Sequence, residues 1–124
     1  MAELIGQILL NQYRVETFAA LTPLGELYRA ADTWHNNKHL ALTNLPKPLS
    51  DDTEALKALD AGSSQLREVS HPNLVPYRGL VQTPNLAFLL EDWVDGPTLR
   101  EVLERAPLST GESLIYIKSL CSGL

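Results

Sequence analysis

Alternating hydrophobic and polar residues in the first third of the chain predict a β-hairpin followed by a third strand. Residues 12–18 and 26–31 alternate in this way, and the turn-forming run Leu-Thr-Pro-Leu-Gly separates them at 21–25. A second polar turn, at 32–37, precedes a mostly apolar segment at 38–45 that is rich enough in leucine to be buried. The pattern therefore predicts three consecutive antiparallel strands.

A helical pattern follows and is expected to extend over residues 50–68. Pro46 and Pro48 end the preceding strand pattern. The run Ser-Asp-Asp at 50–52 then offers side-chain oxygens that cap a helix start. An apolar stripe with helical spacing would face the core and comprises Leu56, Leu59, Leu66 and Val69. Gly62 is followed by two serines, which are also poor helix formers, so this part of the helix is expected to be weakly held.

The last third of the sequence predicts two more strands and then two helices. Residues 74–81 and 86–90 are largely apolar with a turn between them, which brings the expected sheet to five strands. Thr98 with Glu101, and Ser109 with Glu112, then have the spacing of capping boxes at two helix starts. The second helix carries an apolar stripe formed by Leu114, Ile117, Cys121 and Leu124. Because such a stripe must pack on something, we expect it to be an interface.

Composition places the chain among soluble globular domains and excludes several classes of function. Its 124 residues include 15 acidic and 10 basic side chains, so the net charge is −5, and the basic residues are dispersed. This distribution gives no electrostatic footprint for nucleic acid. No run of residues approaches the ~18 apolar positions of a membrane helix, and no basic leader precedes the first apolar stretch. We therefore expect a cytoplasmic protein with no membrane or nucleic-acid partner.

Three further residue patterns have both a structural and a functional interpretation. His35 and His39 lie four residues apart, but that spacing joins metal ligands on a helix and this segment is predicted to be a hairpin, so no metal site is expected. Trp34 lies in a polar turn, where it would either pack over the hairpin or anchor a partner. The single cysteine, Cys121, cannot form an intramolecular disulfide, and its place on an apolar stripe favours a buried residue over a reactive thiol.

The order of these elements, with the residues at their joints, resembles the N-terminal lobe of bacterial serine/threonine protein kinases. The matching segments follow the family pattern without gaps and are YRVE at 13–16, GELYRA at 25–30, LAL at 40–42, HPNLV at 71–75, the hinge at 88–96 and TLR at 98–100. The resemblance implies an α+β fold, with a five-stranded antiparallel sheet, one packed helix and two helices resembling helices D and E. Residues 1–96 would be the N-lobe with its hinge, and residues 97–124 the incomplete start of a C-lobe.

The resemblance also implies where a nucleotide pocket would lie, and this sequence departs from the family there. Ala20 and Thr22 replace two glycines of the phosphate-binding loop, and only Gly25 remains. The alternative is that residues 21–25 form an ordinary hairpin turn. The phosphate-binding lysine of the third strand becomes Thr43, and its glutamate partner falls on Gly62. Lys38 or Lys47 would have to reach in from either end to replace the lost charge.

The hinge carries a further departure. The ungapped alignment places Glu91 at the gatekeeper position, where a carboxylate would disfavour an anionic ligand. A shift of one residue would place Leu90 there and Glu91 in the hinge. The remaining positions that the resemblance assigns to the pocket are Leu27, Ala41, Asp92, Trp93 and Val94.

These departures predict a catalytically inactive, kinase-like (pseudokinase) N-lobe that serves as a protein-interaction or regulatory scaffold module. The family's HRD and DFG motifs do not occur in the 124 residues, so this chain by itself is expected to transfer no phosphoryl group and to bind ATP and magnesium weakly or not at all. The alternative is the N-terminal part of a longer serine/threonine protein kinase whose catalytic C-lobe lies beyond Leu124. In a third interpretation, two copies associate through the apolar helix that begins near Ser109.

Overall fold

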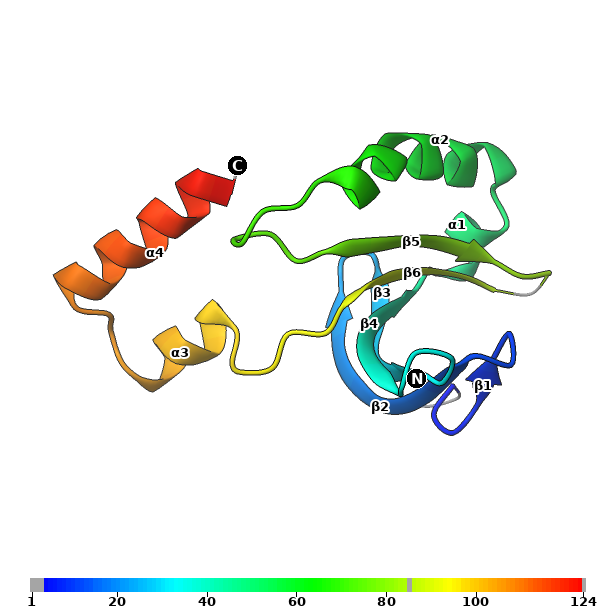
Figure 1. The fold of residues 1–124 in the computed structure, drawn as a ribbon, viewed down its shortest axis with the longest axis horizontal. Coiled ribbons are helices and arrows are strands. Elements are labelled where there is room, and N and C mark those ends of the chain that lie inside the picture. Colours follow the sequence, from blue (N-terminus) through cyan, green and yellow to red (C-terminus); the bar gives the residue numbers. More distant parts are fainter. Residues whose placement is uncertain (1–3, 85, 124) are drawn as a thin grey trace. The chain divides into compact units, whose positions relative to one another are not determined.

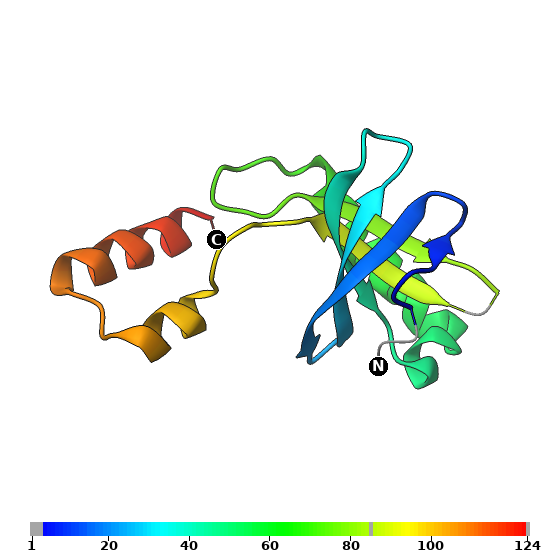
Figure 2. The ribbon, with the colours of Figure 1, turned by 90° about the horizontal axis from the view of Figure 1, so that it is seen from below.

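The computed structural model describes residues 4–84 and 86–123, apart from the side chain of residue 66. Within this range an antiparallel sheet of six strands has the spatial order β1-β2-β3-β4-β6-β5. The strands are β1 (Ile8–Leu9), β2 (Tyr13–Thr22), β3 (Gly25–Asp32), β4 (Lys38–Asn44), β5 (Tyr77–Gln82) and β6 (Ala87–Asp92). The predicted α+β fold, its opening hairpin and the third strand are confirmed, and Figure 1 and Figure 2 show how strongly the sheet curls.

The sheet differs from the prediction at both of its edges. It has six strands and not five, because Leu10 and Asn11, with φ of 53° and 56°, turn the chain so that β1 pairs with the start of β2. A strand of two residues is too short to show alternation, so no pattern predicted it. β5 begins at Tyr77 and not at residue 74, since Pro76 has no amide N–H for a strand ladder.

The predicted helix over residues 50–68 is divided into two segments, and a further short helix that was not predicted precedes them. The short helix is α1 (Lys47–Ser50), and the two segments are α2 (Thr53–Ser64) and the 3₁₀ helix η1 (Gln65–Glu68). α2 starts where the carboxylate of Asp52 accepts a hydrogen bond from the Ala55 amide at 3.0 Å. Of the predicted stripe, Leu56 is buried and Leu59 half-buried, whereas Val69 is 49% exposed and the side chain of Leu66 lies outside the described residues.

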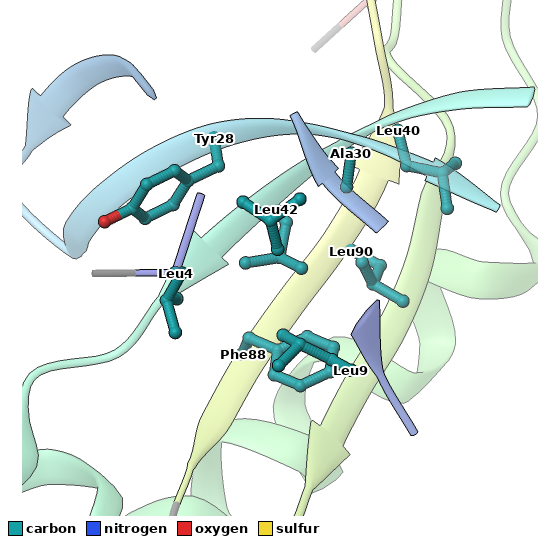
Figure 3. Packing of buried hydrophobic residues seen from close by; sticks show 9 residues of the cluster. Leu4, Leu9, Tyr28, Ala30, Leu40, Leu42, Phe88 and Leu90 are labelled. Carbon is teal, nitrogen blue, oxygen red and sulfur yellow. The ribbon is translucent and has the colours of Figure 1, made fainter. Parts of the chain in front are cut away.

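Two hydrophobic clusters lie on opposite faces of the sheet. The larger contains Leu4, Leu9, Val15, Tyr28, Ala30, Leu40, Leu42, Phe88 and Leu90, most of which are labelled in Figure 3. The smaller contains Leu45, which follows β4, Ala87 and Leu89 of β6, and Leu56 of α2. In Figure 1, α2 runs along β5 and β6. Because side chains alternate along a strand, Leu42 and Leu90 face the first cluster while Thr43 and Leu89 face α2. We call these two sides the core face and the α2 face.

Residues 4–69 and 76–93 form one compact unit, and residues 70–75 and 94–123 form another. The second unit contains α3 (Leu99–Arg105) and α4 (Thr110–Gly123). Both predicted capping boxes are present: the Glu101 amide donates to Thr98 Oγ1 and the Glu112 amide to Ser109 Oγ, each at 3.1 Å. Among the described residues, no helix is long and apolar enough to cross a membrane.

Candidate functional site

The register of the central strands gathers five of the eleven predicted pocket positions on the α2 face. Leu27 of β3 lies opposite Thr43 of β4, which in turn lies opposite Leu89 of β6. Residues opposite one another on neighbouring strands share a face, so these three side chains form one row. One step along the strands, Arg29, Ala41 and Glu91 form a second row. Ala20 extends the first row, since it lies opposite Leu27.

Thr43, the position of the predicted lysine, is 6% exposed and lies between two leucines in its row. Its hydroxyl offers neutral hydrogen bonding and no positive charge. Neither lysine that could replace it is directed there. Lys38 Nζ lies 3.5 Å from Asp92 Oδ1 on the core face, and Lys47 Nζ lies 3.4 Å from Asp51 Oδ1 on an exposed surface.

The β2–β3 connection is a tight hairpin turn. The Thr22 hydroxyl donates to the Gly25 carbonyl at 2.8 Å and accepts from the Leu24 amide at 3.3 Å, so the side chain is used within the turn. Gly25 has a φ of 139°, and a Cβ added there would collide with the carbonyl oxygen of Asn44. Gly25, the remaining glycine of the loop, is therefore required for packing against the end of β4.

Gly62, the position of the predicted glutamate, lies near the end of α2. It is exposed, and a Cβ added there would meet no atom within 4 Å. The acidic residues of α2 and η1, which are Glu54, Asp60 and Glu68, are all exposed. The described part of this helical region thus presents no buried carboxylate.

Glu91 and Leu90 point to opposite faces of β6. Leu90 is 3% exposed and belongs to the core cluster. Glu91 is half-buried between Ala41 of β4 and Tyr77 of β5, and burial raises the pKa of its carboxyl group. A gatekeeper side chain at position 90 would face away from Thr43, whereas the side chain of Glu91 shares its face.

The predicted hinge residues Asp92, Trp93 and Val94 differ in their contacts and belong to two different units. The Asp92 carboxylate accepts hydrogen bonds from Arg78 Nε at 2.6 Å and Nη2 at 3.0 Å, and these bonds lower its pKa. The Asp92 amide donates to the Pro76 carbonyl at 2.9 Å, which links the end of β6 to the approach to β5. Trp93 ends the first unit in a half-buried position, and Val94 begins the second and is exposed.

A polar network that the sequence pattern did not indicate also lies on the α2 face. Glu16 Oε1 lies 3.6 Å from Arg29 Nε and 3.4 Å from His39 Nε2. A bulge between Val15 and Thr17 leaves Glu16 without a cross-strand partner in β3, so simple alternation could not place it beside Arg29. Long polar side chains thus occupy the sheet next to Ala41.

The two histidines considered as metal ligands pair with different carboxylates. His35 Nδ1 lies 2.8 Å from Asp32 Oδ2, whereas His39 contacts Glu16. Over residues 4–84 and 86–123, no three His, Cys, Asp or Glu side chains gather as a metal site.

The predicted interface residues are exposed where they are described. Trp34 is 65% exposed, and its indole Nε1 donates to the Asn11 carbonyl at 3.1 Å. Leu114 and Ile117 of α4 are exposed, and so are three large residues outside the predicted stripe, Ile115, Tyr116 and Leu120. Cys121 is exposed, so the expectation that it is buried was wrong for this chain by itself, because burial of an apolar stripe needs a second surface. Leu124 lies outside the described residues.

Comparison with known proteins agrees with the architecture. No known protein-family pattern matches the chain. A probable serine/threonine-protein kinase, PknB, of Lactococcus lactis subsp. lactis is 24% identical over 121 residues, and a probable serine/threonine-protein kinase of Clostridium acetobutylicum is 24% identical over 122 residues. These matches cover 97% and 98% of this chain but only 19% and 18% of the relatives, so the chain spans about a fifth of their length. The crystal structure of the Mycobacterium tuberculosis PknI kinase domain superimposes with a TM-score of 0.77 at 19% identity, over 94% of this chain and 47% of that domain.

The curled antiparallel sheet with α2 on one face therefore defines a protein of the kinase N-lobe fold class. By sequence, the chain is homologous over nearly its whole length to bacterial serine/threonine protein kinases.

Proposed function

We propose that this chain is a non-catalytic, kinase-like N-lobe that binds a protein partner and holds MgATP weakly or not at all. The observation that carries the proposal is the environment of Thr43. A neutral, buried side chain occupies the position where the resemblance expects a phosphate-binding lysine, and the two lysines nearest in sequence are paired elsewhere. Without a cation at position 43, a triphosphate lacks the counter-charge that the family's lysine supplies, and Arg29 of the neighbouring row already lies 3.6 Å from Glu16.

Three further features support weak nucleotide binding. The hairpin tip has a proline in place of an amide donor, and its Thr22 hydroxyl is engaged within the turn. Glu91 places a carboxyl group on the same face, and in its ionised form this group would repel an anionic ligand. The triplets HRD and DFG are absent from the 124 residues, so no group here would orient a substrate hydroxyl or hold magnesium.

Titration of the purified chain with MgATP, followed by calorimetry and by amide chemical shifts, tests the proposal. We expect no saturable binding at ligand concentrations up to roughly 1 mM, which corresponds to a binding free energy weaker than about −4 kcal/mol. The double variant Thr43→Lys with Gly62→Glu is the matched control, because it introduces the missing ion pair at a buried strand position and at an open helix position. Saturation of the unmodified chain at micromolar MgATP would overturn the proposal, whatever the variant does.

The second candidate is the front part of a longer serine/threonine protein kinase. It is favoured by the coverage of the relatives, since the chain matches only about a fifth of their length. The intact mass of the native product, detected through its amino terminus, distinguishes the two candidates. A mass near 13.7 kDa favours the stand-alone module, whereas a mass larger by a whole lobe favours the longer kinase.

A further inference from the structure

A cavity of about 390 Å³ lies in the first unit near the ends of β4, β5 and β6, where residues of the core face line it together with Leu80 of β5 and Arg67 of η1. Neither Thr43 nor Glu91 lines it, so this hollow is distinct from the candidate nucleotide site. Its volume is in the range of pockets that hold small molecules. We call it the β4–β5 cavity.

The lining of the cavity combines an apolar floor with a cationic rim. The apolar part comprises Tyr13, Leu40, Val81 and Leu90. Leu40 and Leu90 belong to the larger core cluster, and Tyr13 and Val81 pack against it. The cationic side chains at its rim are Lys38, Arg67 and Arg78, with His35 beside them. In a chain of net charge −5, three of the ten lysine and arginine side chains thus surround one hollow.

The carboxylates near the cavity neutralise only part of this charge. Asp92 accepts two hydrogen bonds from Arg78 and lies 3.5 Å from Lys38 Nζ, so it serves two cations at once. Asp32 accepts from Gln12 Nε2 at 3.0 Å and from the Trp34 amide at 3.1 Å, and it contacts His35. Both carboxylates are therefore fully engaged.

Arg67 is the cation that remains. Its guanidinium lies over Gly79, since a Cβ added at that glycine would be 3.6 Å from Arg67 Nε and 3.7 Å from Cζ. Arg67 of η1 thus reaches the edge strand β5. In the described part of the chain, no carboxylate forms an ion pair with Arg67. Three cations against two carboxylates leave one positive charge for a ligand.

We propose that the β4–β5 cavity binds a small phosphate monoester with an apolar body. Its phosphate would lie between Arg67 and Lys38, where a planar guanidinium and an ammonium group supply charge-assisted hydrogen bonds. Its apolar part would pack against Leu40 and Val81. A phosphate suits this rim better than a carboxylate, because its three terminal oxygens can accept from both Arg67 and Lys38, whose contact with Asp92 is long, at 3.5 Å.

Titration of the 124-residue chain with phenyl phosphate, followed by amide chemical shifts, tests this site. We expect saturable shifts at Gly79 and Lys38 and none at Ala41 or Thr43, which lie on the other face. Phenol and inorganic phosphate, the two halves of the probe, should each bind at least about tenfold more weakly, and benzoate should also bind more weakly because a carboxylate has two acceptor oxygens and a phosphate has three. Equal binding of inorganic phosphate, or of benzoate, would overturn the proposed ligand chemistry.

Substitution of Arg67 gives the decisive comparison. Arg67→Gln should weaken phenyl phosphate binding by roughly tenfold, as expected for the loss of one charge-assisted hydrogen bond, while Arg67→Lys should retain part of the affinity. The control is Arg105→Gln, which removes an equal charge from an exposed position on α3 in the other unit and should leave binding unchanged. Since Arg67 is exposed, the variants should fold, and circular dichroism verifies this. An unaltered affinity in folded Arg67→Gln, or an equal loss in Arg105→Gln, would rule the site out.

Discussion

Glu91 of β6 lies directly opposite Ala41 of β4, and both side chains lie on the α2 face of the sheet. Burial raises the pKa of this carboxyl above its usual 4.5. An acid in such a place costs the folded state stability whenever it is ionised, and it gives the unfolding of this unit a particular pH dependence.

Replacement of Glu91 by glutamine should stabilise the chain at neutral pH. The carboxyl is protonated in both states below its unfolded pKa of about 4.5, and its cost develops as the pH rises through the higher folded pKa. The advantage of Glu91→Gln should therefore be small near pH 4 and grow toward pH 7. Urea unfolding of both proteins across this range measures it. A difference that stays constant with pH would contradict the assigned cause.

The Asp92 carboxylate should have the opposite pH dependence. Arg78 and Lys38 lower its pKa below the usual 3.8, so its stabilising effect is present above that value and is lost as the pH falls through the folded pKa. Asp92→Asn should cost about 1 kcal/mol at pH 7 and progressively less below pH 3.8. Asp51→Asn is the control, since the Lys47–Asp51 pair is exposed and its loss should be within about 0.3 kcal/mol.

The two glycines of the candidate site should respond in opposite directions to alanine. Gly25→Ala should destabilise the first unit by at least about 2 kcal/mol, because its Cβ collides with Asn44 and its φ is unfavourable for other residues. Gly62→Ala should instead stabilise it by up to about 1 kcal/mol, since the Cβ meets open space in α2. Thermal denaturation of both variants tests the pair, and a neutral Gly25→Ala would show that the hairpin can move away from β4.

The exposed apolar side chains of α4 should promote association between copies of the chain. We expect a concentration-dependent mass at tens of micromolar, and the double variant Leu114→Lys with Ile117→Lys should return the chain to its single mass. Lys118→Glu is the control on the same helix, because it changes charge and removes no apolar surface. Sedimentation of all three proteins distinguishes the cases, and a single mass for the unmodified chain at these concentrations would contradict the expectation.

Local patterns were sufficient for the elements whose signal lies within a few residues. The Thr98 and Ser109 capping boxes are specified by one polar side chain and a glutamate three positions later, and both formed. The first hairpin likewise follows from alternation on both sides of a proline-containing turn. The rows on the α2 face could also be anticipated, since they depend only on which strands lie side by side.

The features that the sequence did not predict arise from irregular strand pairing and from the presence or absence of tertiary contacts. The bulge at Glu16 changes the alternation of β2 and brings its carboxylate to Arg29, a contact between positions 13 residues apart. Cys121 lies on an apolar stripe, yet burial requires a second surface, and no pattern within a helix reveals whether one is present. Arg67 reaches Gly79 around the edge of β5, which requires the tertiary arrangement of η1 and the sheet.

The irregular pairing of β2 has a consequence for how copies of this protein can assemble. β1 covers only Tyr13 and Arg14, so in the described chain no strand pairs with the outer edge of residues 16–22. Two register shifts, at residues 15–17 and 18–20, bend this edge and space its amides and carbonyls unevenly. An incoming strand from another chain would find few aligned hydrogen-bonding groups. This edge of β2 is thereby protected against fibre-like growth, although the strand is long.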